Sequence, residues 1–140
     1  MPVHEKVSLV VSEWVLKAEN DLLVAAHTLK LGKDTPTDTV CFHAQQCIEK
    51  YLKALLVFKG LDFLKTHNFK KLMALLPART RLNLTVDEQE RITDYAAGAR
   101  YPGWQDISLS ETRRAVAVAR RVRKEIRNFL PKEALRFKKK

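Results

Sequence analysis

Residues 41–60 read CFHAQQCIEKYLKALLVFKG, with no proline and no glycine before Gly60. A stretch this long without helix breakers predicts one helix of roughly five to six turns. Asp38, which follows a proline and a threonine, can cap its start, and Gly60 can end it. At 100° per residue, one side of this helix is apolar. The residues on that side are Cys41, Ala44, Ile48, Tyr51, Leu52 and Leu55.

The other side of the same helix carries a row of polar residues, formed by His43, Gln46, Lys50 and Lys53. An imidazole, an amide and two ammonium groups along one line suit an anionic ligand. The alternative is a plain solvated face, which is the default for a surface helix. Phe42 at the edge of the polar side and Gln45 beside the apolar side mix the two characters. This mixing predicts a helix that is covered on more than one flank.

A chain of 140 residues is long enough for one domain whose core needs no metal and no disulfide. Hydrophobic residues make up 46% of it and only 4 residues are glycine, which favours helices over a turn-rich β fold. Helical periodicity occurs over residues 7–31, 41–60, 67–76 and 86–99, and over a last helix that Ser108 or Ser110 caps and that ends near Leu130. We therefore expect an all-α fold, a five-helix up-and-down bundle.

Local signals mark several helix ends. Thr85 and Glu88 have the spacing of a capping box, and Thr66 can cap the helix over residues 67–76. In the last helix, periodicity points Phe129 inward together with Ala115, Ala119, Val122 and Ile126. The same periodicity predicts a basic row on its far side, formed by Arg113, Arg120, Lys124 and Arg127.

The net charge of +10 is unevenly distributed. Residues 1–60 contain equal numbers of basic and acidic side chains, whereas residues 112–140 carry the whole excess. A basic end of this kind favours a nucleic acid, a nucleotide or an acidic protein as partner, and the alternative is a solubilising surface. We assign residues 1–131 to a single helical domain and residues 132–140 to a basic, flexible tail.

Several classes of protein do not fit this sequence. No apolar run approaches the roughly 20 residues of a membrane span and no signal peptide is recognisable, so we expect a cytoplasmic protein. Cys41 and Cys47 lie about 240° apart on one helix, which predicts buried reduced thiols and no disulfide. The sequence has no Gly-rich phosphate loop, CxxC, HExxH or GxSxG motif. We expect neither a metal nor a cofactor.

Three further places are candidates for a binding site. Asp21 falls at the edge of the apolar stripe of the first helix, where a carboxylate needs a partner, and a lysine or histidine of the 41–60 helix can supply it. Lys65 and His67 lie at the start of a predicted helix, where exposed N–H groups attract anions. Arg100 and Tyr101 precede a proline and predict a binding loop.

Four pieces of sequence, in this order, resemble the HEPN domain family (higher eukaryotes and prokaryotes nucleotide-binding). The pieces are Trp14-x-x-x-Ala18-x-x-Asp21-Leu22, Phe42-His43-Ala44-Gln45-Gln46-x-x-Glu49-Lys50-x-Leu52-Lys53-Ala54, Lys65-Thr66-His67 and Arg100-Tyr101-Pro102. The resemblance covers roughly residues 7–130. It implies a helical bundle, a homodimer, a role with nucleotides or RNA, and a small nucleotidyltransferase as partner in a toxin–antitoxin-like pair.

The resemblance also implies a set of ligand-binding residues, at Asp21, His43, Gln46, Lys50, Lys53, Lys65, His67, Arg100 and Tyr101. The ribonuclease branch of the family carries an Arg-x(4–6)-His motif on its last helix, whereas this chain has no histidine after His67. Arginine cannot replace a base that titrates near neutral pH. The leading hypothesis is therefore a non-catalytic binding module. The alternatives are a ribonuclease that uses His43 and His67 as acid and base, and a purely structural dimer.

Overall fold

The computed structural model describes residues 3–63, 68–97, 102 and 106–136. Every regular element in these ranges is helical, which confirms the predicted all-α class. The α-helices are α1 (Val3–Thr28), α2 (Thr37–Phe58), α3 (Phe69–Ala74), α4 (Val86–Ala97) and α5 (Leu109–Phe129). Short 3₁₀ helices follow α1, α3 and α5: η1 (Leu29–Asp34), η2 (Ala78–Thr80) and η3 (Lys132–Leu135).

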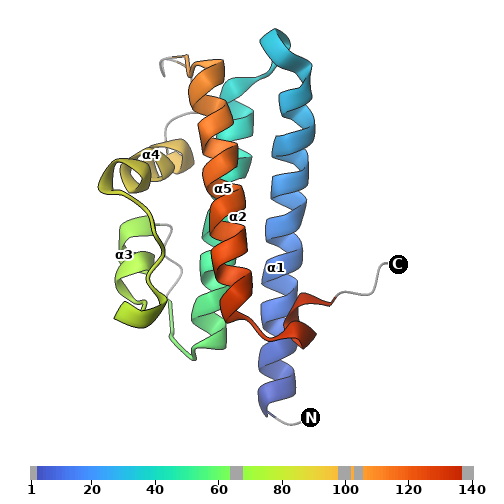
Figure 1. The fold of residues 1–140 in the computed structure, drawn as a ribbon, viewed down its shortest axis with the longest axis vertical. Coiled ribbons are helices and arrows are strands. Elements are labelled where there is room, and N and C mark those ends of the chain that lie inside the picture. The colour runs from blue at the N-terminus through green and yellow to red at the C-terminus, as the bar shows by residue number, and fades with distance from the viewer. Residues whose placement is uncertain (1–2, 64–67, 98–101, 103–105, 137–140) are drawn as a thin grey trace.

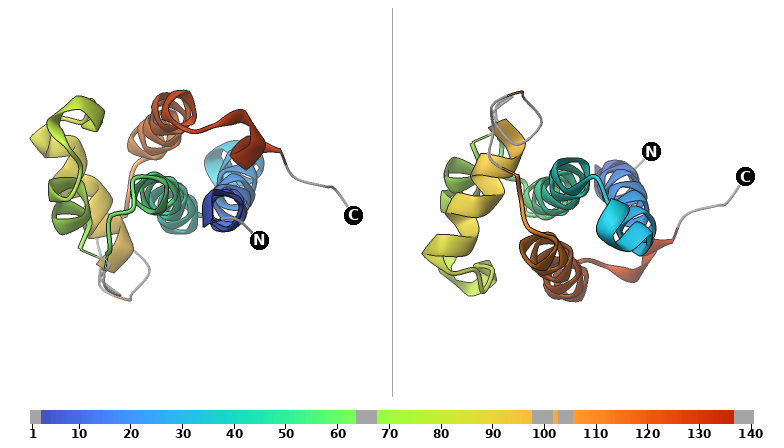
Figure 2. Two further views of the ribbon diagram at one scale, coloured as in Figure 1. Left: turned by 90° about the horizontal axis from the view of Figure 1, so that it is seen from below. Right: turned by 90° about the horizontal axis from the view of Figure 1, so that it is seen from above.

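Three long helices lie side by side and form the body of the molecule (Figure 1). The chain ascends in α1, descends in α2, returns through the short helices α3 and α4, and descends again in α5. Seen from either end, α2 lies in the middle, with α1 on one side and the α3–α4 layer on the other (Figure 2). The helix at the centre is the stretch 41–60, as its mixed polar and apolar pattern predicts.

Helix α2 is buried on most of its surface, because it packs against α1, α5 and α4. Its end is as predicted: Gly60 adopts φ 70, and the N–H of Leu61 donates to the carbonyl of Leu56 at 2.9 Å. Its start is not. Pro36 occupies the cap position, and its carbonyl accepts from the N–H of Val40. Asp38 therefore falls inside the first turn and accepts from the N–H and the hydroxyl of the neighbouring Thr39.

Two other predicted caps and one predicted core residue differ in part from the structure. Ser108, not Ser110, caps α5 and accepts from the N–H of Glu111 at 3.0 Å. Asn68 caps α3, so this helix begins two residues later than predicted, and Thr66 lies outside the described residues. Phe129, predicted to face inward, is 36% exposed because α5 ends at this residue and the chain then turns toward α1.

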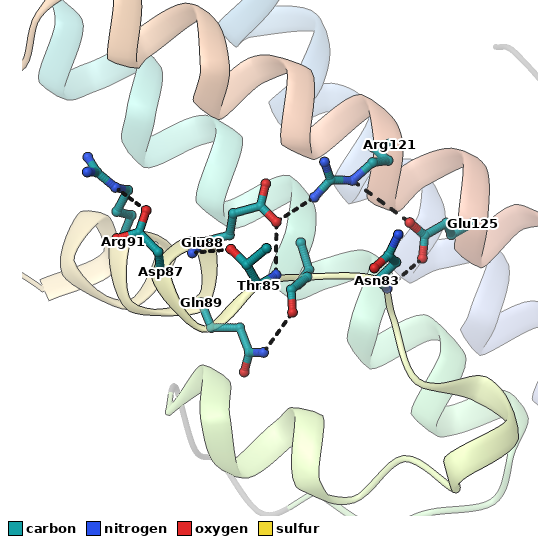
Figure 3. Close-up of polar contacts among 9 residues, drawn as sticks. Asn83, Thr85, Asp87, Glu88, Gln89, Arg91, Arg121 and Glu125 are labelled. Atoms are coloured by element: carbon teal, nitrogen blue, oxygen red, sulfur yellow. Dashed lines mark hydrogen bonds and ion pairs between the residues drawn. The ribbon is translucent and has the colours of Figure 1, made fainter.

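The capping box at the start of α4 is confirmed (Figure 3). The N–H of Glu88 donates to Thr85 Oγ1 at 3.1 Å, and the N–H of Thr85 donates to Glu88 Oε1 at 3.0 Å. The same carboxylate accepts from Arg121 Nη2 at 2.7 Å, and Arg121 also pairs with Glu125. One glutamate therefore both caps α4 and attaches it to α5.

The segment assigned to the tail begins with residues that belong to the core. Helix η3 packs against α1, and Ala134 is fully buried there. The Ser12 hydroxyl donates to the carbonyl of Arg136. Residues 137–140 lie outside the described part of the chain.

Both cysteines are buried free thiols, as predicted. Burial raises the pKa of Cys41 to about 11, although its hydrogen bond to Thr112 opposes the shift. Burial raises the pKa of Cys47 as well. Among the helices within residues 3–63, 68–97 and 106–136, none combines the length and the hydrophobicity that a membrane span requires.

The cap of α4 predicts a pH-dependent contribution to stability. Partial burial of Glu88 acts to raise its pKa, but hydrogen bonds from Arg121 and Thr85 outweigh it and lower the pKa. We expect Glu88→Gln to reduce the free energy of unfolding at neutral pH by about 1 kcal/mol. The difference from wild type is complete above the ordinary glutamate pKa and disappears as the pH falls through the lowered pKa of the folded state.

Urea unfolding over a series of pH values measures this difference. Glu90→Gln on the same helix is the matched control, because its side chain is 58% exposed, and it should change stability by less than about 0.5 kcal/mol. A cost of Glu88→Gln that persists at acidic pH would contradict the assignment.

Candidate functional site

Asp21 of α1 lies between two side chains of α2. Its Oδ1 is 2.8 Å from His43 Nδ1, and its Oδ2 accepts from Lys50 Nζ at 2.5 Å. His43 and Lys50 are seven residues apart, about 10 Å along one face of the helix, so one carboxylate can be held from both directions. The prediction that a lysine or histidine of the 41–60 helix pairs with Asp21 is confirmed.

This cluster is half-open to solvent. The Asp21 side chain is 11% exposed, whereas His43 and Lys50 retain 29% and 25% of their surface. A carboxylate acceptor favours the proton on His43 Nδ1, which leaves Nε2 as an acceptor while the ring is neutral. The ring also meets Phe42 edge to face, at 5.6 Å between centroids. His43 is therefore fixed in orientation from two sides.

Lys53 does not pair with Asp21 and lies in an aromatic setting. Its side chain is only 9% exposed, and its Nζ is 5.3 Å from the centroid of Trp14 and 5.7 Å from that of Phe63. Glu49 Oε2, on the same helix, is 3.8 Å from Lys53 Nζ. A buried ammonium needs such partners, because desolvation of an isolated charge is costly.

Gln46 contacts its own neighbour. Its Nε2 donates to Gln45 Oε1 at 2.8 Å, and Gln46 remains half-buried while Gln45 is 1% exposed. The remaining predicted residues cannot be placed relative to this cluster. Lys65, His67, Arg100 and Tyr101 lie outside the described residues.

The described part of the row carries no excess charge. Asp21 and Glu49 balance Lys50 and Lys53, and no group of three or more His, Cys, Asp or Glu with a geometry for a metal occurs within residues 3–63, 68–97 and 106–136. The arrangement can orient an imidazole and an ammonium group. By itself it does not supply net positive charge.

Unbalanced positive charge occurs on α5 instead. Arg113, Arg120 and Lys124 are exposed along one face of this helix, and none of them has an ion pair with any residue in the described ranges. We call these three residues the basic row. Ala117 and Asn128, also exposed, continue the same face.

The inner arginines of α5 have a different role. Arg123 and Arg127 both pair with Glu19 of α1, at 2.9 and 3.4 Å, and Arg127 also donates to Tyr51 Oη at 3.3 Å. The prediction that places Arg127 in the exposed row is therefore wrong, because Glu19 draws it inward. Sequence reasoning also missed Glu19. Its position two residues before Asp21, on the flank of the apolar stripe of α1, is the signal that could have indicated a second inter-helix pair.

Comparison with known proteins identifies related sequences and folds. The family whose model matches is described as the HEPN domain, and the match covers residues 11–129. Among solved structures, the crystal structure of TT1696 from Thermus thermophilus is similar, with a TM-score of 0.71 over 87% of this chain and 99% of that chain. At 23% identity this likeness concerns the fold alone. No curated protein matches the chain.

Removal of the Asp21 carboxylate, which His43 and Lys50 share, should lower the stability of the fold. Asp21→Asn leaves a half-buried ammonium without its counter-charge, and we expect it to lower the free energy of unfolding by about 2 kcal/mol. Combined with Lys50→Met, the loss should be smaller than the sum of the single losses by about 1 kcal/mol. Urea unfolding measures all three variants.

Glu13→Gln is the control for this cycle, because Glu13 is an exposed acid on the same helix. It should cost less than about 0.5 kcal/mol. Strictly additive losses for Asp21 and Lys50 would show that the two side chains are not coupled.

Proposed function

Because this chain belongs to the HEPN domain family, a nucleotide-binding and ribonuclease-type fold, we propose that it is a non-catalytic module that binds the phosphate groups of a nucleotide or of RNA. In this proposal the chain acts as a homodimer, together with a small nucleotidyltransferase in a toxin–antitoxin-like pair. The resemblance of the sequence to the family supports both the homodimer and the nucleotidyltransferase partner.

The observation that carries the proposal is the basic row on α5. Its three cations are exposed and are not neutralised by any described carboxylate, whereas the neighbouring Arg121, Arg123 and Arg127 are bound to glutamates. Ala117 and Asn128, which continue the same face, add no aromatic or large apolar side chain of the kind that the core of a protein–protein interface requires. A phosphate backbone requires only closely spaced cations and solvent access.

In the proposal, the α1–α2 cluster is a second contact region, separate from the basic row. Asp21 holds Lys50 and His43 in fixed positions, so a ligand would meet an oriented imidazole nitrogen. Gln46 would add a directional hydrogen bond and Lys53 a nearby charge. Lys65, His67, Arg100 and Tyr101 complete the proposed set, with two cations for phosphate and a ring for stacking on a base.

A ribonuclease is the second candidate, and one contact favours it. His43 is oriented by a carboxylate at 2.8 Å, which is an arrangement that general bases use. The same carboxylate is shared with Lys50, and α5 carries no histidine. We therefore expect RNA to bind without being cleaved.

Charge removal from the basic row tests the proposal. We expect the triple variant Arg113→Gln, Arg120→Gln, Lys124→Gln to bind a short mixed-sequence single-stranded RNA about tenfold more weakly, and to reduce the slope of log K against log salt by about 2. Fluorescence anisotropy over a salt series measures both quantities. Gel analysis of the same samples should show intact RNA.

The matched control removes the same charge elsewhere. Lys17, Lys30 and Lys33 are exposed on α1 and η1, and replacing all three with Gln should leave the affinity close to that of wild type. Equal losses of RNA affinity in the two triple variants would show that binding depends only on the net charge of the protein. Absence of RNA and nucleotide binding in the wild-type protein would refute the proposal, and cleavage abolished by His43→Ala would favour the ribonuclease.

A further inference from the structure

A pocket of about 230 Å³ is lined by residues of α2, α4 and α5. Helix α4 lies on the side of α2 that faces away from α1 (Figure 2). The walls of the pocket are mainly apolar. The apolar residues among those that line it are Ala44, Ile48, Ile92, Tyr95, Ala115 and Val118, and the others, Thr85 among them, are polar or charged. None of these residues belongs to the Asp21 cluster or to the basic row, so the pocket is a separate feature of the fold.

Gln45 brings a polar group to this apolar wall. It lines the pocket and is 1% exposed, and its Oε1 accepts from Gln46. Its Nε2 has no hydrogen-bond acceptor among the described residues. A buried amide without a partner is rare in folded proteins, because it has lost its hydration without compensation. The terminal torsion of glutamine is soft, so a small rotation can offer this N–H to a group that enters the pocket.

The mouth of the pocket has one available cation. Its acidic residues all form ion pairs. Glu88 pairs with Arg121 and Asp87 with Arg91 (Figure 3), and Glu111 pairs with Arg91 as well. Arg114, which also lines the pocket, is exposed and has no ion pair within the described ranges. It follows directly on Arg113 of the basic row. A ligand in the pocket could therefore have its charged end near the row.

We propose that this pocket binds a single nucleobase, with a carbonyl or ring nitrogen of the base accepting from the Gln45 amide. The inference rests on the proposed function and adds a site for the base to the site for the phosphate. The volume is below the roughly 300 Å³ at which pockets for whole drug-sized ligands begin, so one ring system enters while sugar and phosphate stay outside. Proteins hold an unstacked base between apolar or aromatic side chains and bind its edge by hydrogen bonds.

Tyr95 adds an aromatic ring to the wall. Burial raises the pKa of its hydroxyl, and the neighbouring Cys41 and Glu111 raise it further. The hydroxyl therefore remains neutral at physiological pH. The apolar part of the wall thus presents an uncharged ring and an amide to the ligand. An uncharged heterocycle matches this wall better than a phosphate group does.

Uncharged nucleosides test the inference without the phosphate contribution. Adenosine, guanosine, cytidine and uridine are titrated against the full chain and followed by saturation-transfer NMR. We expect at least one nucleoside to bind, with its base protons receiving most of the saturation. Gln45→Met, which keeps the length of the side chain but removes the amide, should weaken that binding about tenfold.

A second variant fills the space. Val118→Phe should abolish nucleoside binding, whereas Val24→Phe, the same change at an exposed site on α1, should leave it intact. Melting curves verify that each variant is folded. Loss in Val118→Phe without loss in Gln45→Met would overturn the role given to the amide.

Two results would overturn the pocket proposal as a whole. One is that no nucleoside binds while RNA binding still depends on the basic row, in which case the function proposed above stands without this site. The other is that nucleosides bind equally well to wild type and Val118→Phe, which would place the base elsewhere. Failure of RNA binding in the wild type, in contrast, refutes the proposed function itself.

Discussion

The burial of α2 on several flanks is the constraint on which the rest of this structure depends. A helix at the centre of a bundle buries part of most of its polar side chains, and each buried charge needs a partner because desolvation is costly. Asp21 therefore serves His43 and Lys50, and Glu49 lies beside Lys53. The polar row of α2 is thereby mostly used in holding α1 and α2 together.

The same requirement divides the basic residues of α5. Glu19 and Glu88 engage the arginines that face α1 and α4, and they make those residues part of the packing. The cations on the outer face keep their charge for an external partner. The inner arginines are paired with glutamates and the outer cations are not. The unpaired positive charge of α5 therefore lies on its outer face. This separation links the packing of the bundle to the proposed contact with phosphate.

Much of the fold could be predicted because its signals are local. Periodicity identifies the five helices, and the Thr85–Glu88 box, Ser108 and Gly60 mark boundaries through contacts a few residues apart. The prediction that Asp38 caps α2 is wrong, because Pro36 occupies the cap position. The inner position of Arg127 and the pairing of Glu19 depend on residues about 100 positions apart, which no local pattern encodes.

The candidate site shows the same division. Asp21 was predicted to need a partner on α2 because an acid at the edge of an apolar stripe needs one in any fold, and the pair is present. The contact of Lys53 with both Trp14 and Phe63 could not be foreseen, since it depends on the path of the chain after α2. The pocket around Gln45 was also missed, because its walls come from three helices.

NMR mapping of a short single-stranded RNA on the isotope-labelled protein tests the central claim most directly. The account predicts that the side-chain signals of Arg113, Arg120 and Lys124 shift at low RNA concentration, while those of Arg123 and Arg127 remain unchanged because Glu19 holds them. Equal shifts for the inner and outer arginines, or shifts confined to α1, would contradict it.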